Sequence, residues 1–95
     1  MRTITRKAVE ALLVGSSYKN SNTEVHDKAM YLHGNKIAWL DVNGLLWVSN
    51  CGYQTNTTKE RLNGLPSVNI RQINFTWYLN GKEWDGRPKC IGKIL

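Results

Sequence analysis

The sequence predicts an α+β fold in a single domain over residues 1–95, with an antiparallel sheet of about five to six strands, an N-terminal helix and a short central helix. The first observation is a series of apolar runs separated by tight-turn dipeptides, which is typical of antiparallel hairpins. These dipeptides are Gly34-Asn35, Asn43-Gly44 and Asn80-Gly81. The second is an apolar stripe with helical spacing near the start, and the third is a capping-box pattern near the middle.

We expect the first helix at Thr5–Val14. Thr5 is a residue type that caps helix N-termini, and Ile4 with Val9 has the spacing of a hydrophobic staple. The apolar stripe consists of Ala8, Val9, Leu12 and Leu13. Gly15 is expected to end the helix, because glycine adopts the left-handed conformation at little steric cost.

A three-stranded meander follows, and the turn dipeptides set its expected register. If each turn has two residues, the strands run roughly over Ala29–His33, Lys36–Asp41 and Leu45–Ser49. Residues that pair across strands share a face of the sheet. The expected core face carries Met30, Leu32, Ile37, Trp39, Leu46 and Val48. The expected outer face carries Tyr31, His33, Lys36, Ala38, Leu40, Leu45, Trp47 and Ser49. A slip of one residue in either turn would exchange the two sets.

The segment Thr55–Gly64 predicts the short central helix. Thr57 and Glu60 have the spacing of a capping box, in which each side chain accepts a hydrogen bond from a backbone N–H. Gly64 would end the helix in the left-handed conformation. The free amides at the helix start, with Lys59 nearby, are a candidate anion site, although capping alone also explains these residues.

The last third of the chain predicts a second hairpin from Val68–Ile73 and Phe75–Leu79, followed by a short strand at Lys82–Trp84. This register places Trp77 opposite Trp84, a stabilising aromatic pair. The side chains expected in the core are Phe75, Trp77, Leu79 and Trp84. The basic C-terminal tail is either an edge strand or a loose end.

Residues that carry enzyme chemistry are scarce. The sequence has no P-loop, GxSxG, HExxH, GxGxxG or paired CxxC motif. Two histidines, His26 and His33, and two distant cysteines, Cys51 and Cys90, lack the number and spacing of metal ligands. We therefore expect a protein that is not an enzyme and has no catalytic residue, metal, cofactor or small-molecule substrate.

Charge and hydropathy narrow the expected partners. The chain has 13 Lys and Arg against 7 Asp and Glu, and its net charge of +6 favours nucleic acid or an acidic protein surface. No apolar run is long enough to span a membrane or form a signal peptide, so we expect an intracellular protein without membrane contact. A reducing compartment favours free thiols at Cys51 and Cys90. The oligomeric state is left open.

Two function hypotheses follow. The first is nucleic-acid binding, with bases of single strands, rather than duplex, stacked on an aromatic, basic sheet face. The candidate binding residues are Tyr31, His33, Lys36, Trp47, Lys59, Arg61, Arg71, Lys82 and Arg87. The second is binding of a protein partner, since exposed aromatics also suit protein interfaces. Both fail if a helix covers Tyr31 and Trp47 as a second core layer.

Three stretches, YLHGNKIAW, TNTTKERLNGLP and WYLNGKEWDG, resemble a group of small, mostly uncharacterised proteins that bacteriophages encode. The similarity covers roughly Tyr31–Gly86, and the TNTTKERLN run is its most distinctive part. The resemblance implies a phage origin, an accessory role and a location in the cytoplasm of the infected bacterial host. For the protein-binding hypothesis the resemblance implies an inhibitor of a host or antiphage-defence protein, and it implies no catalytic residues.

Overall fold

The computed structural model describes residues 2–94 and confirms the α+β class. The two helices are α1 (Thr3–Val14) and α2 (Asn56–Leu62). The strands are β1 (Tyr18–Asn20), β2 (Thr23–His26), β3 (Ala29–Leu32), β4 (Asn35–Leu40), β5 (Leu45–Val48), β6 (Ile70–Ile73), β7 (Thr76–Leu79), β8 (Lys82–Glu83) and β9 (Lys89–Lys93).

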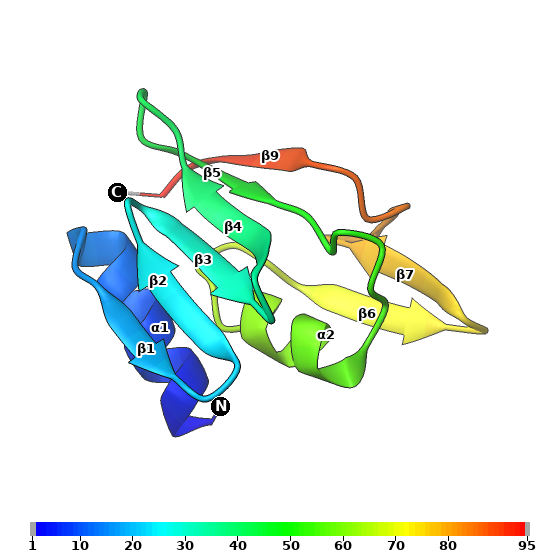
Figure 1. Cartoon of the computed structure of the whole chain (residues 1–95). Helices are drawn as coiled ribbons and strands as arrows, with labels where there is room; N and C mark the ends of the chain where they lie inside the picture. Colours follow the sequence, from blue (N-terminus) through cyan, green and yellow to red (C-terminus); the bar gives the residue numbers. More distant parts are fainter. Residues whose placement is uncertain (1, 95) are drawn as a thin grey trace.

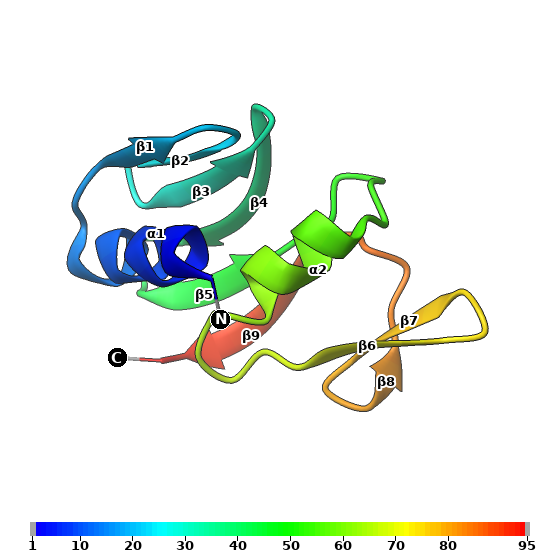
Figure 2. The same ribbon diagram turned by 90° about the horizontal axis from the view of Figure 1, so that it is seen from below.

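The strands form two antiparallel sheets where the sequence predicted one. The larger sheet has the order β1-β2-β3-β4-β5-β9 (Figure 1), and the smaller has the order β6-β7-β8, with β8 labelled in Figure 2. The basic tail becomes the edge strand β9, which pairs with β5 and so occupies the edge that the C-terminal hairpin would need. The large sheet curls around α1, which packs on β1, β2 and β3 (Figure 2).

One hydrophobic core joins both helices and both sheets. Its buried side chains include Leu12 of α1, Met30 and Val48 of the large sheet, Leu62 of α2 and Trp77 of the small sheet. Trp77 of β7 and Trp84, which directly follows β8, have ring centroids 6.2 Å apart, and the Trp84 N–H donates to the Trp77 carbonyl, so the two lie opposite each other as the sequence predicted. The concave side of the large sheet, which faces α1, therefore carries the buried side chains of the sheet. The convex side is turned away from α1.

The first hairpin turn lies one residue earlier than expected. Leu32 pairs with Asn35, so the two turn residues are His33 and Gly34, which both have positive φ (52° and 80°). A bulge then leaves Ile37 without a paired residue on β3, because Tyr31 pairs with Lys36 whereas the preceding residue, Met30, pairs with Ala38. Ile37 and Ala38 are both buried in succession. The bulge therefore reverses the alternation, and Trp39 points to the outer face, where the sequence predicted the core.

The second hairpin also differs from a two-residue turn. Asp41 accepts a hydrogen bond from the N–H of Gly44, and the Asp41 N–H donates to Leu45, so the loop contains three residues. Only Gly44 has positive φ (77°), the arrangement of a turn that ends in a glycine bulge. As a result Trp39 pairs with Trp47, and Leu40 pairs with Leu46.

Both helix starts differ from the prediction. Helix α1 begins at Thr3 after Arg2, and Thr5 is buried inside the helix rather than capping it. Helix α2 is capped by Thr55, whose hydroxyl accepts from the Thr58 N–H, so Thr57 and Glu60 form no capping box. Gly15 does end α1 in the left-handed conformation, as expected.

Two further residues have roles other than those predicted. Gly64 does not adopt positive φ at the end of α2; a Cβ there would collide with the Thr5 side chain, so glycine permits the close approach of the two helices. Phe75, predicted in the core, is 88% exposed, because Asn74 and Phe75 form the turn between β6 and β7. Cys51 and Cys90 are both free thiols.

Candidate functional site

The convex side of the large sheet carries a continuous aromatic surface. Register places two rows of side chains on this side, Lys19, Glu24, Tyr31 and Lys36 in one and His26, Ala29, Trp39, Trp47 and Cys90 in the other. We call His26, Tyr31, Lys36, Trp39 and Trp47 the aromatic face. Its three large aromatic side chains are half-buried and point away from α1, so no helix among residues 2–94 forms a second layer over them.

The rings of the aromatic face lie nearly parallel in two pairs. The Trp39 and Trp47 rings have centroids 6.2 Å apart and planes within 3° of each other. The His26 and Tyr31 rings are stacked at 4.7 Å with planes 11° apart. The Lys36 Nζ lies 4.8 Å from the centre of the Trp39 ring, in cation–π contact. The face therefore combines flat apolar area with a cation next to it.

Asp41 holds Trp47 in its orientation. The Trp47 Nε1–H donates to the Asp41 Oδ2 at 2.9 Å, and the Asn43 and Leu45 N–H groups donate to Oδ1 at 2.8 and 3.0 Å. The Trp47 hydrogen bond, followed by those from the backbone, lowers the pKa of Asp41 below its ordinary value. The carboxylate is therefore ionised at neutral pH, and the indole is oriented before any ligand arrives.

The aromatic face is only weakly basic. Lys36 and Lys19 lie in the same row as Glu24, and the Glu24 Oε2 is 3.9 Å from the His26 Nε2. Much of the positive charge of the chain therefore lies elsewhere on the molecule. Electrostatic attraction of an anionic ligand to this face would come from Lys36 and from the overall charge of +6.

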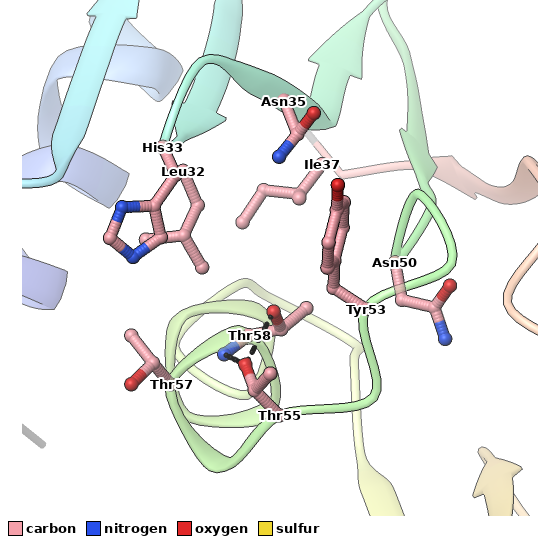
Figure 3. A pocket seen from close by; sticks show the side chains of 9 residues that line it. All are labelled: Leu32, His33, Asn35, Ile37, Asn50, Tyr53, Thr55, Thr57 and Thr58. Carbon is pink, nitrogen blue, oxygen red and sulfur yellow. Dashed lines mark hydrogen bonds between the residues drawn. The ribbon is translucent and has the colours of Figure 1, made fainter.

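A hollow of about 340 Å³ opens at the β3–β4 turn, between buried side chains of the large sheet and the start of α2. Its lining is Leu32, His33, Asn35, Ile37, Asn50, Tyr53, Thr55, Thr57 and Thr58. Figure 3 shows the His33 imidazole and the Tyr53 ring on opposite sides of this space, with Leu32 and Ile37 between them. The turn thus takes His33 off the sheet face on which the sequence predicted it and places it at the rim of the hollow.

The remaining predicted cations do not join the aromatic face. Lys59 of α2 donates to the Gln72 Oε1 at 3.1 Å, and Arg71 is exposed on β6. Lys82 is exposed on β8, and the Arg87 Nε lies 3.5 Å from the Asp85 carboxylate. These four residues surround the small sheet, whereas Tyr31, Lys36 and Trp47 lie together on the large one.

Arg61, predicted to bind a ligand, is buried with 2% exposure. Its guanidinium donates to the Thr23 Oγ1 at 2.9 Å, to the Thr5 Oγ1 at 3.0 Å and to the Glu60 carboxylate. Burial would raise the pKa of Glu60, but hydrogen bonds from Thr5, the Arg2 N–H and Arg61, with the Arg61 charge, lower it overall. Arg61 therefore connects α2 to α1 and β2 in the interior, and the prediction that it binds a ligand at the surface is wrong.

Two members of the aromatic face were not among the predicted site residues. Trp39 was assigned to the core because a bulge at Ile37 leaves no mark in the apolar pattern. His26 belongs to a Thr-Glu-Val-His run whose alternation places it opposite Ala29, next to Tyr31. The alternation of that run was the available signal for His26, whereas no sequence signal marked the bulge.

Comparisons with known proteins bear on origin rather than chemistry. No curated protein and no solved structure matches the chain. Within residues 2–94 no cluster of His, Cys, Asp or Glu could hold a metal ion, and no helix is long and apolar enough to cross a membrane. A family model described as Kyanoviridae Gp96 protein matches residues 1–94. Because that match spans nearly the whole sequence, the chain belongs to the Kyanoviridae Gp96 family and is a small phage-encoded protein.

Proposed function

We propose that this phage protein binds single-stranded nucleic acid on the aromatic face. The observation that carries the proposal is the nearly parallel pair of Trp39 and Trp47 rings with the Lys36 ammonium beside the Trp39 ring. Such a pair matches the way in which sheet proteins hold single strands, with bases stacked on aromatic rings and cations beside the phosphates. The net charge of +6 supports a polyanionic ligand.

The geometry supports stacking without sequence readout. Asp41 and the backbone fix the Trp47 ring, so little side-chain freedom is lost when a base stacks on it. Each base–aromatic stack contributes about 1–3 kcal/mol and accepts any base. The protein would then act as a non-enzymatic accessory protein in the cytoplasm of the infected host, where single strands arise during replication and transcription.

A second candidate function is inhibition of a host or antiphage-defence protein. It is favoured by one observation, the presence of Glu24 and Asp41 near the aromatic rings, which weakens attraction for phosphate. Aromatic side chains with mixed charges around them are typical of protein interfaces. In this case Tyr31, Trp39 and Trp47 would contact a protein partner.

Fluorescence anisotropy with labelled 15-nucleotide DNA and RNA strands, at several salt concentrations, tests the first function. We expect salt-sensitive binding, a loss of roughly fivefold or more in Trp39→Leu by lost stacking, and a log–log salt slope about 0.7 lower in Lys36→Gln. Lys7→Gln is the matched control, because Lys7 is an exposed lysine of α1 and has no place on the aromatic face. Circular dichroism verifies that each variant is folded.

The two candidates separate in a pull-down from host lysate with and without nuclease. Partners that vanish after nuclease treatment support nucleic-acid binding, and a partner that survives and requires Trp39 supports the inhibitor. The absence of any salt-sensitive binding to strands by the wild-type protein would refute the first function.

A further inference from the structure

The tip of the β6–β7 hairpin presents an apolar ring to solvent. Asn74 and Phe75 are the two turn residues between Ile73 and Thr76, which pair with each other. Phe75 is 88% exposed, and the neighbouring Ile73 is 53% exposed. In Figures 1 and 2 this hairpin projects from the body of the molecule, on the far side from β1 and β2. The Phe75 ring is thus held away from the core.

The local backbone does not account for phenylalanine at this position. Asn74 and Phe75 have φ values of 49° and 68°, a left-handed pair that two-residue hairpin turns require. Asparagine accepts this conformation, but the second position strongly favours glycine, and a bulky side chain there is an outlier. Phe75 is therefore not stabilised by burial, and its backbone has a conformation that is unfavourable for a bulky residue. Within the described residues the fold buries only the base of this hairpin, and the ring at its tip is free to contact an external partner.

The surroundings of Phe75 indicate an anionic partner with stacked rings. Across residues 70–79 the only charged side chain is that of Arg71, which is exposed, and Gln72 and Asn74 add amide groups. Lys59 of α2 donates to the Gln72 side chain and so brings a second cation to β6, next to the last strand pair before the turn. An apolar wedge with arginine, asparagine and glutamine next to it is the combination with which proteins enter the minor groove and part a base step.

We propose that the β6–β7 tip inserts the Phe75 ring between neighbouring base pairs of duplex nucleic acid, with Arg71 and Lys59 against the phosphates. The proposal shares its class of partner with the proposed function but uses a different surface, on the small sheet. A chain with both surfaces would engage a single strand on the aromatic face and a duplex step at the hairpin tip.

A duplex that carries 2-aminopurine, whose fluorescence rises when it is unstacked, tests the insertion. We expect the wild-type protein to raise this fluorescence and to bind the duplex. Phe75→Gly and Phe75→Ala should abolish the rise and weaken duplex binding roughly tenfold, because one aromatic–base stack is lost. Val42→Ala is the matched control, since Val42 is 99% exposed in the β4–β5 loop and distant from this hairpin in sequence.

The glycine variant keeps the test interpretable. Glycine suits φ near 68° better than phenylalanine, so Phe75→Gly should melt no earlier than the wild type, and its loss of fluorescence change would reflect the missing ring. A wild-type protein that leaves 2-aminopurine stacked, or a Phe75→Gly protein that unstacks it fully, overturns the proposal.

The same assays separate this proposal from the proposed function. Single-strand binding that depends on Lys36 and Trp39, with no unstacking of the duplex, leaves the proposed function standing and removes the hairpin insertion. Phe75-dependent unstacking without Lys36-dependent single-strand binding has the opposite meaning. Nuclease-resistant capture of a protein through Phe75, with no effect on the duplex, also overturns the insertion.

Discussion

Replacement of Arg61 by alanine is expected to cost more stability than any surface substitution in this protein. The guanidinium is 2% exposed and joins three segments, through Thr5 of α1, Thr23 of β2 and Glu60 of α2. Arg61→Ala removes these hydrogen bonds and leaves the Glu60 carboxylate without its cation. It also leaves a cavity between the two helices and the sheet.

The expected magnitude follows from burial. Removal of one partner from a buried ion pair costs about 3–5 kcal/mol. The Glu60 side chain is 27% exposed, so water can solvate part of the stranded charge, and we expect the lower end, about 3 kcal/mol. Domains of this size have unfolding free energies of about 5–15 kcal/mol. The loss corresponds to a decrease in Tm of roughly 12–24 °C.

Urea denaturation followed by tryptophan fluorescence and far-UV circular dichroism measures this loss. Arg61→Met, which keeps most of the volume, should be less destabilised when it is combined with Glu60→Gln than when made alone, because the double variant has no stranded charge. Arg71→Ala is the control, with an expected change within about 0.5 kcal/mol for an exposed arginine. An Arg61→Ala protein as stable as that control would refute the structural role assigned to Arg61.

Two further predictions concern the same helix contact. Gly64→Ala should lower the free energy of unfolding by about 1–3 kcal/mol, measured in urea, because the new methyl group would collide with the Thr5 side chain; unchanged stability would mean that the helices are not in close contact. The pKa of Glu60 is lowered in the folded state, so its contribution is complete above about pH 4.5 and is lost as the pH falls through its folded value. Glu60→Gln should therefore flatten the acid side of the stability profile, and an unaltered profile would contradict this.

Turns and helix ends that depend on local chemistry follow the sequence prediction. Asn80-Gly81 forms the expected turn, with φ values of 50° and 88°, and Gly15 ends α1 as expected. The register of a hairpin can shift by one residue in response to distant packing, and there the prediction is wrong. Gly34 sits second in its turn, not first, and the Ile37 bulge then turned Trp39 outward. Neither the shifted turn nor the bulge changes which residues in the runs are apolar, so the alternating pattern of the sequence does not reveal them.

The same division applies to the candidate site. Tyr31, Lys36 and Trp47 were predicted on one outer face, and register places them there. Arg61 was predicted on the surface because charged side chains are mostly exposed, and its buried partners, Thr5 and Thr23, are more than thirty residues away in the chain. No local pattern links three such distant positions.

The amino-acid sequence by itself determined the class of the fold, the number of helices and the positions of most strands, because periodicity and turn residues act over a few neighbours. Tertiary structure alone decided that the strands form two sheets and that Trp39 lies beside Trp47 on the convex side. It also decided that Arg61 is buried and hydrogen-bonded between α1, α2 and β2. These outcomes depend on β9 pairing with β5, on a bulge and on contacts between α1 and α2. Each is set by competition among distant segments for the same edges and the same buried volume.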